Sequence, residues 1–225
     1  MTSSTRYQRV VAIDGPAASG KSSVARELAR RIGFLYVNSG AMYRAVTWHV
    51  LECSVDPADR PAIARLADTM HLDCDLDHDH TTIALEGIDP TPHLRDVRVN
   101  DAVSLVSSVP HVREVLVAKM RAYAVSNDVV IEGRDIGSVV FPDTPYKFYI
   151  DASPEIRSQR RAAQGQMDRI AARDQADSSR SASPLTIAAD AEVIDSSTLS
   201  IDSVVEKIIQ RLQVKGFTAG AILPA

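Results

Sequence analysis

The sequence predicts an α/β protein in which helices cover both faces of a five-stranded parallel sheet. Five short apolar runs, rich in β-branched residues, recur along the chain, and stretches with helical periodicity separate them. A glycine-rich turn also joins the first run directly to an amphipathic helical pattern. The predicted strands are residues 9–14, 34–38, 128–132, 146–151 and 192–195.

The turn after the first strand has the pattern G-x-x-x-x-G-K-S and predicts a phosphate-binding loop of the P-loop NTPase type. Gly15 and Gly20 let the backbone wrap around an anion so that successive N–H groups point inward. Lys21 is expected to reach the β- and γ-phosphates of a bound nucleotide, and the Ser22 hydroxyl to ligate Mg²⁺. A helix from Lys21 to about Arg31 would direct its positive end at the same phosphates. The candidate ATP-binding residues are Gly15, Pro16, Ala17, Ala18, Ser19, Gly20, Lys21, Ser22 and Ser23.

Between the second and third strands lies a stretch of about 90 residues, far longer than a crossover helix requires. We expect it to hold a small β-sheet, with strands at 71–76 and 82–86, and helices around 99–106 and 112–124. The run of aspartates and histidines at 73–80 suggests either a metal site or a solvated acidic hairpin. The hairpin is favoured, because the run lacks the glycine turn and terminal glutamate of an EF-hand loop.

The segment 154–183 is rich in arginine, and after it come the last strand and an amphipathic helix at 201–214. In most proteins such a segment is an exposed, solvated helical pair. Beside a phosphate loop it suggests a lid that closes over polyphosphate, mobile without nucleotide and ordered with it. We therefore divide one domain, 1–225, into a core (1–38, 125–153, 184–225), an insertion (39–124) and a lid (154–183).

Composition limits the classes of partner. The 225 residues are 45% hydrophobic and 24% charged, with net charge −4, so no basic excess indicates a nucleic-acid polymer. The first nine residues contain no apolar signal region, and no stretch reaches the roughly 18 apolar residues of a membrane span. We expect a cytoplasmic monomer without membrane contact. Cys53 and Cys74 have no metal-type spacing and are expected to be unpaired packing residues.

Ligands of parallel sheets bind at the carboxyl ends of the strands, so residues 15–22, 38–44, 133–135 and the segment after 151 are expected to converge on one crevice. Two further motifs, at 38–44 and 132–137, follow predicted strands and each bring an arginine, Arg44 and Arg134, to this crevice. Two facing anion sites suggest phosphoryl transfer to a phosphorylated acceptor. The guanine-reading N-K-x-D motif is absent, which argues against a GTP switch. The chain closely resembles bacterial cytidylate kinases, the (d)CMP kinase family of nucleoside monophosphate kinases. The segments that carry the resemblance are IDGPAASGKSSVA, SGAMYR, VPHVRE, EGRDIGSVVFPD and DASPEIRSQRR.

The resemblance implies transfer of the ATP γ-phosphoryl group to CMP or dCMP, with Mg²⁺, an NMP-binding insertion and a short mobile lid. It also implies roles for individual residues. The catalytic set would be Lys21, Arg134, Arg157 and Arg161, the two last being lid arginines. The substrate-binding set would be Ser39, Arg44, Arg134 and Arg180 for the acceptor phosphate, Ser104, Arg113 and Asp135 for cytosine, and Arg173 and Asp177 for the ribose, with Tyr43 as a further member.

The cytosine assignment also follows from chemistry. A carboxylate complements the 4-amino donor of cytosine, and a guanidinium with a hydroxyl complements its N3 and O2 acceptors. Asn38 stands where many family members have aspartate. The alternatives that remain are a UMP/CMP, adenylate or guanylate kinase, and a regulatory module that hydrolyses ATP slowly and signals by lid closure.

Overall fold

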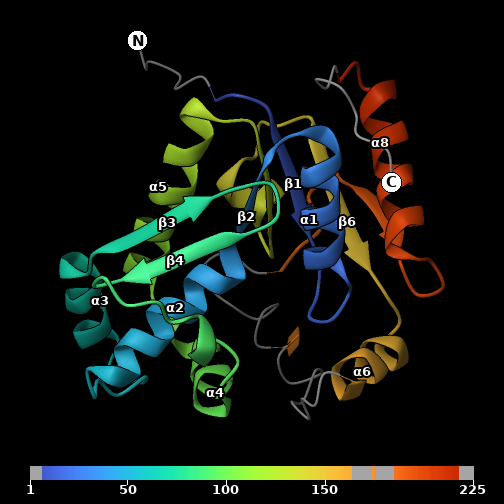
Figure 1. Cartoon of the computed structure of the whole chain (residues 1–225). Coiled ribbons are helices and arrows are strands. Elements are labelled where there is room, and N and C mark those ends of the chain that lie inside the picture. The colour runs from blue at the N-terminus through green and yellow to red at the C-terminus, as the bar shows by residue number, and fades with distance from the viewer. Residues whose placement is uncertain (1–6, 164–173, 176–184, 218–225) are drawn as a thin grey trace.

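A parallel sheet of five strands forms the centre of the computed structural model, which describes residues 7–163, 174–175 and 185–217 (Figure 1). The strand order across the sheet is β2-β5-β1-β6-β7. The strands are β1 (Val10–Asp14), β2 (Leu35–Asn38), β5 (Val129–Gly133), β6 (Tyr146–Asp151) and β7 (Glu192–Asp195). Each predicted strand is confirmed to within one residue at either end.

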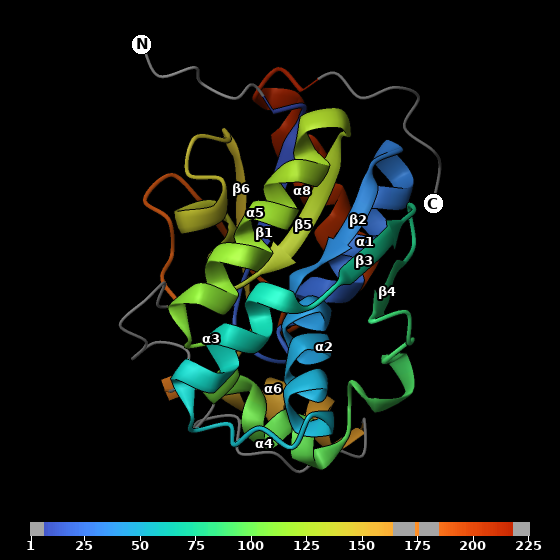
Figure 2. The ribbon, with the colours of Figure 1, turned by 90° about the vertical axis from the view of Figure 1, so that its left-hand side faces the viewer.

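Helices cover both faces of this sheet, as the sequence predicts. On one face α1 packs beside α8, and on the other lie α2 and α5 (Figure 2). The helices are α1 (Lys21–Ile32), α2 (Ser39–Glu52), α3 (Arg60–Thr69), α4 (Val97–Val106), α5 (Pro110–Ser126), α6 (Pro154–Ala163) and α8 (Ile201–Val214), with short turns η1 (Thr91–His93) and η2 (Ile136–Val140, π-helical).

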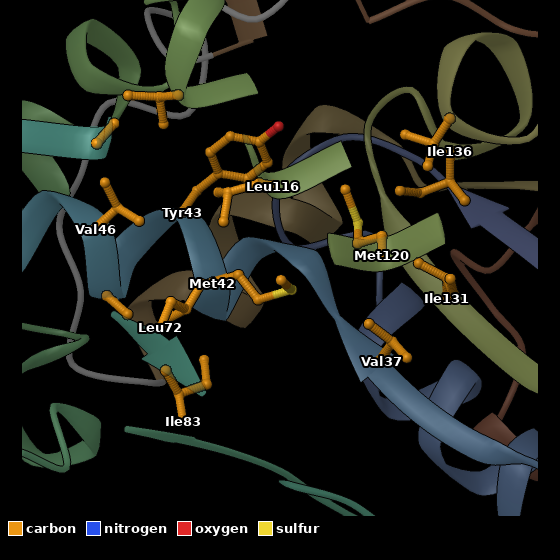
Figure 3. Close-up of a cluster of buried hydrophobic side chains, with 14 of the residues drawn as sticks. Val37, Met42, Tyr43, Val46, Leu72, Ile83, Leu116, Met120, Ile131 and Ile136 are labelled. Atoms are coloured by element: carbon orange, nitrogen blue, oxygen red, sulfur yellow. The ribbon is translucent and has the colours of Figure 1, made fainter. Parts of the chain in front are cut away.

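Strand β1 shows why the sheet is buried on both sides. Val11 and Ile13 belong to the apolar cluster under α1 and α8, whereas Val10 and Ala12 belong to the cluster under α2 and α5. Successive side chains of a strand point to opposite faces, so a strand covered on both faces must be apolar throughout. Figure 3 shows part of the second cluster, in which Ile131 and Ile136 lie near Met120.

The long insertion contains the predicted acidic hairpin, formed by the antiparallel strands β3 (Leu72–Leu76) and β4 (Thr81–Leu85). Its turn lies against the edge of β2: the carbonyl of Asp77 accepts from the Tyr36 N–H at 2.8 Å, and the Thr81 hydroxyl donates to the Tyr36 carbonyl at 2.9 Å. The Asp77 carboxylate accepts from the N–H of Asp79 at 2.7 Å, which orders the turn. The hairpin therefore covers the edge of the parallel sheet.

The structure adds two α-helices that the sequence analysis does not predict, α2 and α3, and corrects one expectation. The motif at 38–44 forms the start of a helix: α2 begins at Ser39, and the Asn38 side chain caps it by accepting from the Ala41 N–H at 2.9 Å. Cys74 packs against the core as expected, but Cys53 is exposed and does no packing, because it follows the last turn of α2. Among the described residues, no helix has the length and apolar character needed to cross a bilayer.

Candidate active site

The carboxyl ends of β1, β2 and β5 open into a cleft of about 830 Å³. Ligands of open parallel sheets bind at this edge, because all strands end there and the loops that follow them meet. The segments that line it include 17–24, 38–41, 133–135 and 160–161. These segments are far apart in the sequence, and their predicted convergence is confirmed.

The phosphate loop is closely packed against the sheet. Gly15 has φ +154°, and a Cβ there would lie 2.1 Å from the carbonyl oxygen of Ile150 on β6, so no side chain fits. Gly20, with φ +88°, turns the chain into α1. The Ser19 hydroxyl is buried, has no hydrogen-bond partner among the described residues, and lies 3.1 Å from the place of that Gly15 Cβ. The loop thus encloses an unsatisfied polar group, as expected of an anion cradle.

Lys21 begins α1 with a buried side chain, and its Nζ donates to the Pro16 carbonyl across the loop at 3.1 Å. Its Nζ also lies 4.0 Å from a carboxylate oxygen of Glu132, the buried acid near the end of β5. These two contacts help to hold the ammonium group within the loop. A cation held in this way is in place before an anion binds in the loop, so binding needs little reorganisation.

Glu132 is a site residue that the sequence analysis does not identify. Its carboxylate accepts from the Ser22 hydroxyl at 2.8 Å and lies 3.5 Å from the Tyr36 hydroxyl. Burial, with the nearby Glu132 charge, raises the pKa of Tyr36 well above its ordinary value, so the phenol stays protonated and can donate. The sequence feature that could have identified Glu132 is its place as an acidic residue near the end of an otherwise apolar strand, at the sheet edge where ligands bind.

Elsewhere in the wall of the cleft, Arg113 of α5 forms a buried ion pair with Asp135, which follows β5. Both side chains are 6% exposed. The guanidinium carbon of Arg113 lies 5.4 Å from the ring centre of Tyr43, and its Nη1 also lies 3.4 Å from the Ser107 carbonyl. A planar cation and a carboxylate therefore stand side by side in the cleft wall, offering donors and an acceptor along one edge.

The remaining predicted acceptor residues that the structure describes line the same cleft. Ser39 and Arg44 lie on α2, Ser104 on α4, and Arg134 directly after β5. The Ser39 hydroxyl donates to the Glu132 carbonyl at 2.7 Å, and Arg44 Nη1 donates to the Gly40 carbonyl at 2.9 Å. Arg134 Nη1 reaches across to the Gly15 carbonyl at 3.0 Å, which connects the segment after β5 to the phosphate loop.

The arginines of α6 differ from one another. Arg157 does not belong to the described cleft wall: it is buried, donates to the Ala17 carbonyl at 3.3 Å and pairs with Asp174. Arg160, to which the sequence analysis gives no role, donates to the Ser19 carbonyl at 3.2 Å and to the Ser196 carbonyl at 2.7 Å. Arg157 and Arg160 therefore hold the phosphate loop through its carbonyls.

Arg160 and Arg161 both line the cleft, and of these two only Arg161 was expected at the site. The predicted ribose and phosphate residues Arg173, Asp177 and Arg180 lie outside the described residues, as does most of the predicted lid.

The class of protein follows from this geometry. A phosphate loop after the central strand of a parallel sheet, an insertion with its own small sheet, and a second group of arginines in one cleft define a P-loop nucleoside monophosphate kinase fold. The family model for cytidylate kinase matches residues 11–214. The chain belongs to the cytidylate kinase family and is a phosphotransferase.

Individual relatives support this assignment. The cytidylate kinase of Pelotomaculum thermopropionicum is 45% identical over 214 residues, covering 90% of this chain and 95% of that protein. The cytidylate kinase of Corynebacterium efficiens is 42% identical over 213 residues, covering 89% of this chain and 93% of that protein. A solved structure, TT1252 from Thermus thermophilus, covers 93% of this chain and 98% of its own at 18% identity and a TM-score of 0.48, and the assignment does not depend on it.

Proposed function

We propose that this protein transfers the γ-phosphoryl group of ATP to CMP and dCMP, giving ADP and CDP or dCDP. A phosphate oxygen of the acceptor forms a bond to the γ-phosphorus while the bond to the β–γ bridging oxygen breaks and ADP leaves. The observation that carries the proposal is the pairing of Arg113 with Asp135 in the wall of the same cleft that the phosphate loop lines. Family membership supports the same substrates.

On the donor side, the N–H groups of the loop and the Lys21 ammonium hold the ATP phosphates. Catalysis in such a transfer consists mostly of positioning and of stabilising charge as it moves, so no covalent enzyme intermediate is needed. Arg134 and Arg161 would neutralise oxygens of the two substrates, since both line the cleft. Arg157 would act through the loop carbonyl that it holds.

The residues present fit a magnesium ion. The Ser22 hydroxyl and the Glu132 carboxylate are oxygen donors 2.8 Å apart at the phosphate loop, the ligand chemistry that Mg²⁺ selects. We propose that these two residues hold it, together with the ATP phosphates. When bound, the ion would neutralise phosphate charge. Asn38 carries an amide and not a carboxylate, and its side-chain oxygen caps α2.

On the acceptor side, Asp135 would accept from the 4-amino group of cytosine, and Arg113 and Ser104 would donate to the ring acceptors. Uracil presents a carbonyl where cytosine presents the amino group, so UMP would leave the buried Asp135 facing an acceptor. Ser39 and Arg44 would meet the acceptor phosphate. We assign this task to the insertion 39–124 together with Asp135, which belongs to the core formed by 1–38, 125–153 and 184–225.

A coupled assay for ADP with single monophosphates as acceptors tests the proposal. Phosphorylation of CMP and dCMP, with weak activity on UMP, AMP and GMP, is the expected result. A preference for AMP or GMP would instead identify another nucleoside monophosphate kinase. ADP release at the same rate without any acceptor would identify an ATP-hydrolysing regulatory module.

A further inference from the structure

Asp14 is a buried carboxylate to which the proposed reaction gives no role. It is the last residue of β1, directly before Gly15 of the phosphate loop, and it is 5% exposed. In the register of the sheet it stands beside Gly133, where β5 ends and the chain turns into Arg134 and Asp135. Asp14 thus lies between the donor loop and the segment proposed to read the acceptor.

Both oxygens of the Asp14 carboxylate are used by that neighbouring segment. Oδ1 accepts from the Ile136 N–H at 2.8 Å and Oδ2 from the Gly137 N–H at 2.7 Å. These N–H groups open the helical turn η2, and the first N–H groups of a helical turn have no partner within it. Asp14 therefore caps η2 from a different strand, more than 120 residues away in the sequence.

The residue in the capping position of η2 is Asp135, and aspartate is among the best capping residues. Within the described part of the chain, however, Asp135 makes no side-chain capping bond, and its carboxylate pairs with Arg113 instead. The two aspartates divide two tasks between them. Because Asp14 satisfies the turn, Asp135 can turn its carboxylate toward the cleft.

A second contact joins the same two segments in the opposite direction. Arg134 Nη1 donates to the carbonyl of Gly15, the residue after Asp14, at 3.0 Å. Ile136 also packs its side chain into the core near Ile131, which fixes the turn from the other side (Figure 3).

The charge of Asp14 is consistent with this role. Burial raises the pKa of Asp14 to about 6, and the nearby Asp135 charge also raises it. The two N–H bonds and the Arg134 charge lower it. The carboxylate is thus ionised at about pH 7.5, with both oxygens available as acceptors. Lys147 packs its aliphatic stem near Gly137, and Tyr149 of β6 also lies within the electrostatic reach of Asp14.

We propose that Asp14 is a positioning residue for acceptor recognition: by capping the turn after Asp135 it keeps the Asp135 carboxylate available for the substrate base. The proposal rests on the proposed function of Asp135. It assigns Asp14 to the acceptor, although Asp14 adjoins the ATP-binding loop in the sequence. Without Asp14, Asp135 would cap its own turn and leave Arg113.

Two substitutions of Asp14 remove its capping bonds to different extents. Asp14→Asn keeps the shape and one acceptor oxygen, whereas Asp14→Ala removes both acceptors. We expect the KM for CMP to rise about tenfold in Asp14→Asn and further in Asp14→Ala, with the KM for ATP changed less than about threefold. The preference for CMP over UMP should fall in parallel.

The matched control is Asp128→Asn, at the opposite end of β5. The Asp128 carboxylate also accepts a backbone N–H from the segment that leads into β1, that of Arg9 at 2.9 Å, but Asp128 lies away from the cleft. This variant should keep wild-type kinetic constants. If Asp14 served stability alone, the Asp14 variants would melt earlier with unchanged KM for CMP and an unchanged CMP/UMP ratio, and that outcome would overturn the proposal.

Hydrogen exchange of the wild-type protein tests the contact without any variant. The amides of Ile136 and Gly137 should exchange at least about tenfold more slowly than exposed loop amides, because Asp14 accepts from both. Equally fast exchange would contradict the proposal even if the variants failed to fold. A wild-type enzyme inactive on CMP would refute the proposed function instead, and faster exchange of these two amides in Asp14→Ala than in the wild type would still show that Asp14 caps the turn.

Discussion

Replacing Asp135 with asparagine tests base recognition most directly, because the change removes one charge and keeps the shape. The new amide could present either its oxygen to cytosine or its NH₂ group to uracil, so discrimination between the two bases should collapse. For the wild type we expect kcat/KM for CMP to exceed that for UMP by about 10²-fold, from the cost of an unpaired buried polar group. In Asp135→Asn the ratio should fall below about tenfold. dCMP should follow CMP, since no proposed base contact involves the 2′-hydroxyl.

The structure indicates that this substitution also lowers the stability of the protein, and that loss must be separated from the effect on base recognition. The Arg113 side chain is 6% exposed, and removing its carboxylate partner leaves a buried cation. Removing one partner of a buried ion pair costs about 3–5 kcal/mol of unfolding free energy. The amide oxygen can still accept from Arg113, which reduces the expected cost to about 1–3 kcal/mol. Urea unfolding measures this loss, and kinetics must be recorded where the variant remains folded.

The assay is kcat/KM for CMP, dCMP and UMP in the wild type, in Asp135→Asn and in the control Asp128→Asn. If Asp135 only braced Arg113, activity on both pyrimidines would drop by a similar factor, and the CMP/UMP ratio would stay constant. A constant ratio in a folded variant would remove Asp135 from the recognition set, and with it the role inferred for Asp14.

Three further predictions concern the phosphate loop and its neighbour. Lys21→Ala should remain folded and lose at least tens-fold in kcat, about 2 kcal/mol of transition-state stabilisation, and near-normal turnover would refute the loop assignment. Gly15→Ala should lower the unfolding free energy in urea by about 1–3 kcal/mol, because its Cβ would meet the Ile150 carbonyl at 2.1 Å; unchanged stability would contradict that packing. Burial raises the pKa of Asp14 from 3.8 to about 6, so between these values the folded state binds more protons than the unfolded state. The wild type should therefore lose roughly 3 kcal/mol of stability, relative to Asp14→Asn, as the pH rises from about 4 to about 7. A pH-independent difference between the two proteins would show that the carboxyl is not perturbed.

The strands, the phosphate loop and the family can all be recognised in the amino-acid sequence. These features are local: a β-branched run, two glycines at fixed spacing and a lysine at the head of a helix lie within about 20 residues of one another. The acidic hairpin is also predictable, because both strands and their turn are adjacent in the chain. Even the meeting of distant loops follows from one rule, that parallel strands end at the same edge.

How the site residues pair with one another depends on the folded chain. The sequence analysis does not identify the roles of Asp14, Glu132 and Arg160, because their partners lie more than 30 residues away in the sequence. Neither strand's own sequence determines the strand order that places β1 beside β5. The sequence also does not show that Arg157 contacts a loop carbonyl while Arg161 lines the cleft, because both lie on the same helix and their partners come from other parts of the chain. A side chain's type fixes which bonds it can make, but only its position in the folded chain fixes which groups are within reach.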